Sequence, residues 1–127
     1  MPATTHTTAP RYPLATNPTI FGKILRGEIP AKVVLEDDKA IAFHDIAPKA
    51  KVHVIIIPKQ HMQCLRCMEA ADADLMAHLL QFANQVADKL GVKHSGYRLI
   101  TNAGEGAGQT VPHLHFHLLA GPNLPAL

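Results

Sequence analysis

The alternation of hydrophobic and polar positions predicts five strands and two helices in this chain of 127 residues. The strands are expected at residues 32–36, 39–44, 51–57, 97–102 and 112–120. Asp37-Asp38 suits a tight turn between the first two strands. The order is one helix, three strands, one helix and two strands, which indicates an α+β fold around a mainly antiparallel five-stranded sheet.

The two helices have recognisable beginnings and ends. The short helix is expected to begin with Asn17 as its N-cap and to end at Gly27. The long helix is expected to begin at Asp72 or Asp74 and to end at Gly91. We expect its apolar stripe to pack on the sheet. The stripe consists of Leu75, Leu79, Phe82, Val86 and Leu90, widened by Met76, Leu80, Ala83 and Ala87.

The composition fits one domain, residues 18–127, because 47% of the chain is hydrophobic. The net charge of +2 argues against nucleic-acid binding, which usually needs a clustered basic patch. No apolar run approaches the length that crosses a bilayer, so no membrane partner is expected. Residues 1–17 are rich in Thr, Ala and Pro and contain no acid. We expect a disordered arm there, or alternatively an organellar transit peptide.

The two cysteines, Cys64 and Cys67, are separated by two residues. The expected state is a pair of reduced thiols in a reducing compartment, and therefore a cytoplasmic protein. A redox pair and half of a zinc site are the alternatives. The sequence lacks the second Cys-x-x-Cys that would strengthen the zinc interpretation.

Three histidines, His113, His115 and His117, alternate with apolar residues in the last predicted strand. Side chains of a strand alternate between its two faces. The imidazoles are therefore expected to share one face, and Leu114 and Phe116 the other. Three interpretations are open: ligands of a transition metal, buried structural histidines, or a nucleophilic imidazole oriented by its neighbours.

A glycine-rich loop leads directly into the histidines. Gly104, Gly106 and Gly108 precede Gln109 and Thr110. Glycines let backbone N–H groups approach an anion such as phosphate, although they also form ordinary turns. A phosphate cradle beside three histidines favours chemistry at phosphorus.

Two further features suit a nucleotide but have ordinary alternatives. The carboxylate of Asp45 suits either the two hydroxyls of a ribose or a turn. Apolar side chains near the N-terminus suit either the cover of a purine ring or the core. They are Ile20, Phe21, Ile24 and Ile29.

The chain resembles the histidine triad family, in particular its Hint branch. The family signature is His-φ-His-φ-His-φ-φ, where φ is apolar, and residues 113–119 match it at every position. The resemblance covers roughly Pro18 to Gly121. Further Hint-like blocks lie at residues 20–24, 27–30, 42–46, 57–61, 96–99 and 102–111.

The resemblance implies a homodimer whose two five-stranded sheets join into one. It also implies an enzyme that hydrolyses adenosine 5′-phosphoramidates to AMP, with no cofactor and no metal. His115 would be the nucleophile that is transiently nucleotidylated, and His117 would contact the phosphate. His113 and His53 would form a supporting hydrogen-bond relay.

The remaining nucleotide contacts are also implied by the resemblance. Asn102, Gln109 and Thr110 would hold the phosphate and the leaving-group side, and Asp45 would hold the ribose. The residues around the base would be Phe21, Ile24, Ile29, His44 and Ile46, with Gly108 and Val111 as further contacts in the loop.

Some positions depart from the family pattern. Thr110 stands where serine is frequent, Pro112 replaces a frequent aromatic residue, and the tail has no tryptophan. Some bacterial relatives bind zinc through an N-terminal Cys-x-x-Cys, and the corresponding residues 19–22 contain no cysteine. The alternative function is that of a non-catalytic purine nucleotide-binding or adaptor protein.

Overall fold

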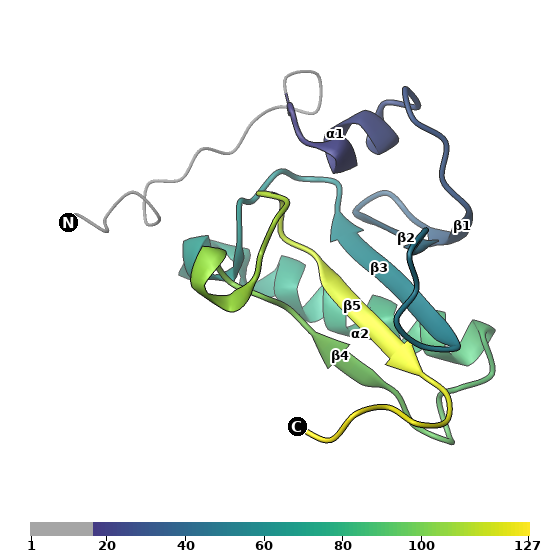
Figure 1. The fold of residues 1–127 in the computed structure, drawn as a ribbon. Helices are drawn as coiled ribbons and strands as arrows, with labels where there is room; N and C mark the ends of the chain where they lie inside the picture. Colours follow the sequence, from purple (N-terminus) through teal and green to yellow (C-terminus); the bar gives the residue numbers. More distant parts are fainter. Residues whose placement is uncertain (1–16) are drawn as a thin grey trace.

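The computed structural model describes residues 17–127, which form two helices and one five-stranded sheet (Figure 1). The helices are α1 (Ile20–Leu25) and α2 (Ala73–Lys89). The strands are β1 (Val33–Glu36), β2 (Ala40–His44), β3 (Val52–Pro58), β4 (Arg98–Ile100) and β5 (Phe116–Ala120). Short 3-10 turns are η3 (Leu65–Cys67), η4 (Ala70–Asp72) and η5 (Glu105–Ala107). The predicted order of elements and the α+β class are confirmed.

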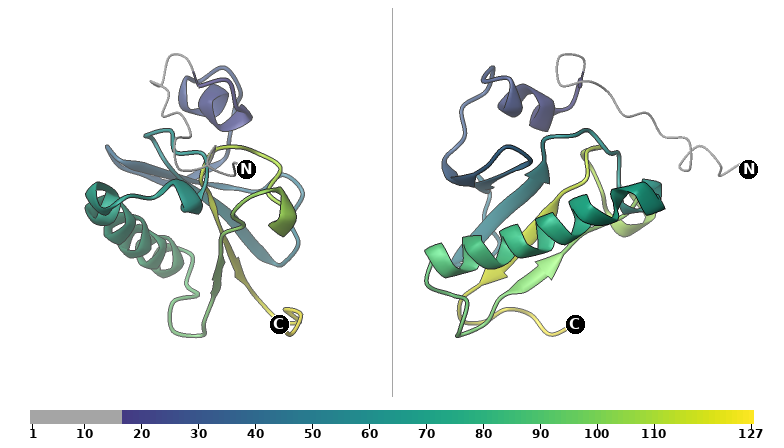
Figure 2. Two further views of the ribbon diagram at one scale, coloured as in Figure 1. Left: turned by 90° about the vertical axis from the view of Figure 1, so that its left-hand side faces the viewer. Right: turned by 180° about the vertical axis from the view of Figure 1, so that it is seen from behind.

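The strands run antiparallel in the order β1-β2-β3-β5-β4, and α2 lies across one face of the sheet (Figure 2). In the register of the central strands, His117 lies between Ile55 of β3 and Ile100 of β4. Because side chains alternate along a strand, this register decides which residues share a face.

The two faces of the sheet bury two separate hydrophobic clusters. Val54, Ile56 and Leu118 belong to the cluster that packs against α2. The second cluster joins α1 to the opposite face and consists of Phe21, Ile41, Phe43, Ile55 and Ile57. His53 lies two residues from Ile55, and His117 is the direct partner of Ile55 on β5, so both lie on this second face. His53 and His117 are therefore on the side of the sheet away from α2.

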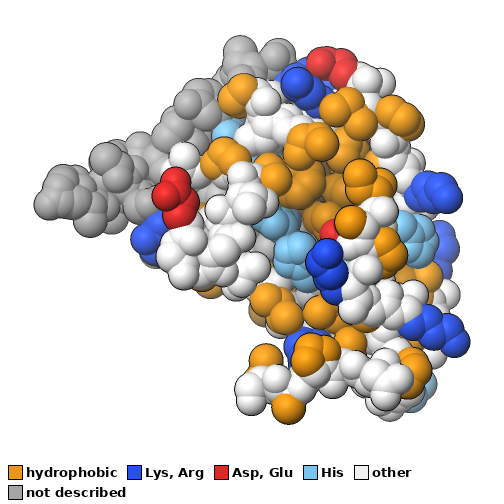
Figure 3. Space-filling model, viewed as in Figure 1, with side chains coloured by type: hydrophobic (Ala, Val, Ile, Leu, Met, Phe, Trp, Pro, Cys, Tyr) orange, Lys and Arg blue, Asp and Glu red, His pale blue; other side chains and the backbone are white. Residues whose placement is uncertain are grey.

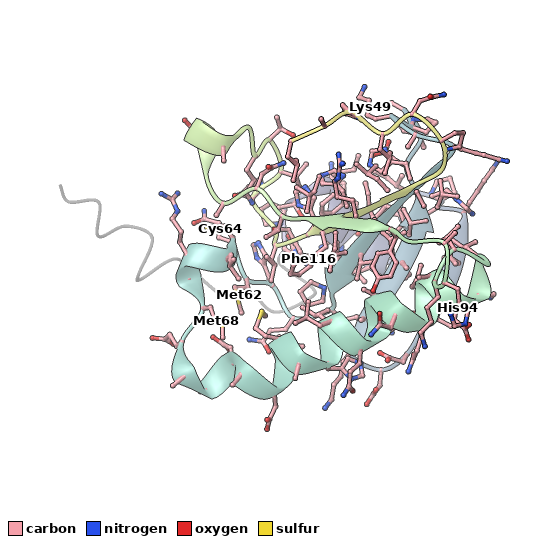
Figure 4. The ribbon with its side chains drawn as sticks, turned by 90° about the horizontal axis from the view of Figure 1, so that it is seen from below. Lys49, Met62, Cys64, Met68, His94 and Phe116 are labelled. Carbon is pink, nitrogen blue, oxygen red and sulfur yellow. The ribbon has the colours of Figure 1, made fainter. Side chains whose placement is uncertain are left out.

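Figure 4 shows the same layering from below. Met62, Cys64 and Met68 lie near the beginning of α2, whereas Lys49 lies on the opposite side of the sheet. Cys64 and Cys67 are buried, and their sulfur atoms lie 3.9 Å apart.

The short helix begins later than the sequence predicts. Its N-cap is Thr19, whose hydroxyl accepts the N–H of Gly22 at 3.0 Å. Asn17 is not the N-cap, because its carboxamide oxygen instead accepts both the N–H and the hydroxyl of Thr19. The predicted arm, residues 1–17, lies outside the described residues except for Asn17, which is fully buried.

The last strand is shorter than predicted, because β5 begins at Phe116 rather than at residue 112. β3 continues to Pro58, but its pairing with β5 ends at Ile56 and Phe116. Before that point, the N–H of Leu114 donates to the carbonyl of Met62. The predicted apolar side is nevertheless correct, since Leu114 and Phe116 pack in the cluster beneath α2.

The long helix begins after Asp72 and ends before Gly91, whose φ of 74° suits glycine, as predicted. Its predicted stripe is wrong at Leu80, which lies at the solvent edge and is 51% exposed. Among the described residues, no helix is long and apolar enough to cross a membrane.

The neighbouring leucines of α2 provide a matched test of this packing. We expect Leu79→Ala to lower the free energy of unfolding by about 2–5 kcal/mol, because Leu79 is only 1% exposed and its removal leaves a cavity. Leu80→Ala should change it by no more than about 0.5 kcal/mol. Urea denaturation measures both, and equal losses would contradict this placement of the helix.

Candidate active site

The geometry of His115 fixes the position of its ring proton. The residue lies just before β5, is 7% exposed, and its Nδ1 is 2.8 Å from the carbonyl oxygen of His113. A carbonyl only accepts, so Nδ1 carries the proton and the neutral ring keeps its lone pair on Nε2. Burial lowers the pKa of His115, against the opposing effects of the His113 hydrogen bond and the Asp45 charge. The neutral ring therefore has its lone pair on Nε2.

Neighbouring side chains hold this ring in place. Phe21 contacts it edge-on with ring centres 5.0 Å apart, and the His117 ring lies 5.1 Å away. The hydroxyl of Thr101 donates to the carbonyl of His115 at 2.8 Å. The backbone and the ring of His115 are thus both restrained.

His117 belongs to a chain of hydrogen bonds that also fixes its proton. The N–H of Lys49 donates to Nδ1 of His53 at 3.0 Å, so neutral His53 carries its proton on Nε2. That Nε2–H lies 2.9 Å from Nδ1 of His117 and 3.3 Å from a carboxylate oxygen of Asp45. His117 accepts at Nδ1 and therefore presents an N–H donor at Nε2.

Both rings of this pair favour the neutral form. Burial lowers the pKa of His53, and the Asp45 charge opposes this effect. Burial also lowers the pKa of His117, with help from the neighbouring His115 and His53. A neutral pair can keep the directed hydrogen bond between the two rings.

His113 does not face the site with the other two histidines, contrary to the expectation of a shared, accessible row. Its ring is fully buried, stacks on His61, and bonds through both nitrogens. Nε2–H donates to the carbonyl of Pro58 and Nδ1 accepts from the amide of Asn17, both at 2.9 Å. Burial is the largest effect that lowers the pKa of His113 to about 4. The structure therefore gives His113 a supporting position.

The same hydrogen bonds bear on the metal interpretation. His113, His115 and His117 cannot jointly coordinate an ion, because both nitrogens of His113 are already bonded within the fold. Ligand atoms of Asp45, His53 and His117 do lie within 4.8 Å of one another. However, the Lys49 N–H keeps the proton of His53 on Nε2, the atom that would have to bind the ion. The arrangement favours a hydrogen-bond relay over a metal centre.

Three pockets follow one another across this face of the sheet. The first contains Asp45, His53, Asn102 and His117. The second shares Asp45 and His53 with the first and continues past His44 and Ile46 to Pro30 and Ala31. The third shares those last two residues and reaches Ile24 and Ile29. Figure 3 shows histidine side chains at the centre of this face, with hydrophobic side chains above them.

A family model described as the HIT domain matches residues 26–124. The chain belongs to the HIT family. A HIT-like protein of Helicobacter pylori is 48% identical over 102 residues, which cover 80% of this chain and 95% of that protein. A HIT-like protein of Synechococcus elongatus is 49% identical over 106 residues, covering 84% of this chain and 92% of that one.

Solved structures of HIT proteins have the same fold. A HIT family hydrolase from Clostridium thermocellum superposes with a TM-score of 0.83 at 44% identity, covering 87% of this chain and 96% of that one. A histidine triad nucleotide-binding protein from Candida albicans has a TM-score of 0.72 at 33% identity, with coverage of 86% and 84%. The predicted HIT-like fold is confirmed.

The glycine loop lies beside a different pocket from the one that contains His53 and His117. Gly104, Gln109 and Thr110 line that pocket together with Gln63 and Arg66. The Gln109 amide bonds within the protein: its oxygen accepts the Gly104 N–H, and its nitrogen donates to the carbonyls of Gln63 and Val111. Gln109 therefore shapes the loop, whereas Thr110 is exposed and Gly108 has a φ of 90°.

The residues expected around a base divide into two groups. Ile24, Ile29, His44 and Ile46 line the second and third pockets, and Ile46 is 98% exposed. Phe21 is buried and braces the histidine rings instead. Asp45 forms the predicted turn, because its Oδ1 accepts the N–H of Ala47, and its other oxygen lies 3.3 Å from Nε2 of His53.

Sequence reasoning missed three groups that determine the ring protons. They are the Asn17 amide, the Lys49 N–H and the Pro58 carbonyl. Two are backbone groups, which leave no side-chain signal in a sequence. Asn17 does carry a signal, as a polar residue beside the first Hint-like block, but the Asn-Pro pattern also predicts a helix cap.

The pKa of His113 predicts a specific loss of stability in acid. The unfolded chain takes up a proton on this histidine near pH 6.5, whereas the folded protein does so only near pH 4. Stability from this group is complete above pH 6.5 and falls as the pH drops through this window, by roughly 3 kcal/mol. His113→Asn, which cannot titrate, should be less stable at pH 7.5 but less sensitive to acid. Urea denaturation from pH 7.5 to 4 measures the free energy of unfolding of both proteins. The same dependence on pH in both would contradict this prediction.

Proposed function

We propose that the protein hydrolyses adenosine 5′-phosphoramidates to AMP through a covalent nucleotidyl-histidine on His115. The observation that carries the proposal is the Nδ1–H of His115 on the His113 carbonyl, which leaves a lone pair on Nε2. Membership of the HIT family supports it, as do the HIT neighbours from Legionella pneumophila and Clostridium thermocellum that are described as hydrolases.

In the first step, Nε2 of His115 attacks the α-phosphorus and the P–N bond breaks. The amine leaves with the electron pair of that bond and takes a proton from solvent. In the second step, water attacks the same phosphorus, the bond to Nε2 breaks, and AMP and a proton are released. Two displacements, each with a lower barrier, replace one difficult displacement.

The relay around His117 suits the charge that develops on phosphate. Its Nε2–H is a fixed donor, because Nδ1 accepts from His53. Donors that are already oriented stabilise a transition state without reorganisation. We assign the phosphate to His117 and Asn102, which share a pocket, and the leaving-group side to the neighbouring loop with Thr110. Gln109 acts there by holding the loop.

The order of the pockets also fits the ribose and the base of the nucleotide. Asp45 lies in both the first and the second pocket, where its carboxylate would accept the two ribose hydroxyls. The base would then lie along the second and third pockets, which are lined by His44, Ile46, Ile24 and Ile29. These apolar walls suit the faces of a purine.

The proposal includes a cytoplasmic homodimer. β4 forms one edge of the sheet, and two copies joined along this edge would continue the sheet into ten strands. Analytical ultracentrifugation tests this part directly: a monomer at micromolar concentration contradicts the dimer without affecting the assignment of His115.

The nucleophile is tested with His115→Ala and the control His94→Ala, since His94 is an exposed histidine just after α2. We expect AMP release from an adenosine phosphoramidate to fall by at least about 1,000-fold in the first variant and to stay normal in the second. Mass spectrometry of the quenched wild-type protein should detect AMP on His115. Near-normal turnover by His115→Ala contradicts the assignment, and AMP binding without hydrolysis by the wild type favours the adaptor alternative.

The ribose contact is tested by removing the hydroxyls from the substrate. The wild type should have a kcat/KM about 10-fold to 100-fold lower for a 2′,3′-dideoxy phosphoramidate, because hydrogen bonds to a carboxylate are lost. Asp45→Ala should have nearly the same kcat/KM for the phosphoramidate with and without the ribose hydroxyls. The control Asp88→Ala, on α2 behind the sheet, should discriminate as the wild type does. If Asp45→Ala still has the lower kcat/KM of the wild type for the dideoxy substrate, the ribose does not bind at Asp45.

A further inference from the structure

We infer that Asn17 is a positioning residue, which holds the ring of His113 and through it orients His115. Asn17 precedes the part of the chain that matches the HIT family model, yet it is fully buried against the histidines. The inference deepens the proposed function, because it identifies a group behind the nucleophile.

The orientation of the Asn17 amide follows from its partners. Its oxygen lies 3.1 Å from the backbone N–H of Thr19, which only donates, so this atom must be the oxygen. The amide nitrogen therefore faces Nδ1 of His113 at 2.9 Å and donates to it. An acceptor at this place would instead require a second proton on the ring.

Packing leaves Asn17 little freedom to move. The guanidinium of Arg26 donates to the backbone carbonyl oxygen of Asn17 at 2.6 Å. Gly22 lies so close that an added Cβ atom would be 2.5 Å from the same oxygen. Gly22 in the first turn of α1 and Arg26 at its C-terminal end thus hold Asn17, and α1 also carries Phe21, whose ring contacts both His113 and His115.

The link to the nucleophile runs through the backbone of His113. Its ring is held on one side by Asn17 and on the other by the Pro58 carbonyl. Its own carbonyl receives the Nδ1–H of His115. A shift of the His113 ring would therefore move the acceptor that fixes the reactive tautomer of His115.

The charge state of His113 matters as well. The titratable groups that act on it are His61, stacked at 4.9 Å, and His115, and both disfavour a proton on its ring. A charged His113 would oppose the positive charge that forms on His115 during attack at phosphorus. A neutral amide donor at Asn17 keeps His113 neutral, whereas a carboxylate there would charge it.

The test combines nitrogen NMR of the histidine rings with kinetics. In the wild type at pH 7, His113 should be protonated on Nε2 only. In Asn17→Asp, both of its nitrogens should be protonated, and kcat should fall roughly 10-fold to 100-fold with a smaller change in KM. Asn84→Asp is the matched control. Asn84 is exposed on α2, and its side-chain oxygen accepts a hydrogen bond from the hydroxyl of Tyr97, which an aspartate can also accept.

Gly22→Ala is an independent second variant, because its methyl group displaces Asn17 without changing it. It should shift the Nδ1 resonance of His113 and lower kcat, as Asn17→Ala should. A wild-type proton on Nδ1, a neutral His113 in Asn17→Asp, or full kcat in Asn17→Ala would overturn the inference. The NMR results need no substrate. If the wild type turns over no phosphoramidate but the ring protons behave as described, the proposed function fails while the role of Asn17 in fixing His113 stands.

Discussion

The hydrogen bond from Nδ1–H of His115 to the carbonyl of His113 is the interaction on which the rest of the site depends. Imidazole has two similar nitrogens, and only a fixed acceptor decides which of them is basic. Here the acceptor belongs to a residue whose own ring is bonded on both sides and is excluded from solvent. The site therefore consists of one ring with its lone pair on Nε2 and a buried support.

The sheet makes this arrangement possible because one of its faces is packed into the core and the other is only partly covered. One face packs against α2 and supplies most of the hydrophobic core, so its residues are apolar. The other face is covered only in part, by α1 and Phe21, and has room for polar groups at His53 and His117. The pairing of β3 with β5 then brings these two histidines within hydrogen-bond distance.

The sequence predicted the features that depend on local pattern. The alternation around residues 113–119 correctly assigned Leu114 and Phe116 to the core, and Gly91 correctly marked the end of α2. It did not predict that β5 begins at Phe116, because the preceding backbone bonds outside the sheet, where the N–H of Leu114 donates to the carbonyl of Met62.

The burial of His113 depends on partners that are distant in the chain. Asn17 is 96 residues away and Pro58 is 55 residues away, so no local pattern distinguishes His113 from His117. The proton positions depend in addition on backbone groups such as the Lys49 N–H, whose direction is set by the fold alone.

The protons themselves provide the most direct test of this account. Neutron diffraction from a deuterium-exchanged crystal near pH 7 should locate deuterium on Nδ1 of His115, and on Nε2 of both His53 and His117. Deuterium on Nε2 of His115 would place its lone pair against the His113 carbonyl and would contradict the assignment of His115 as a nucleophile.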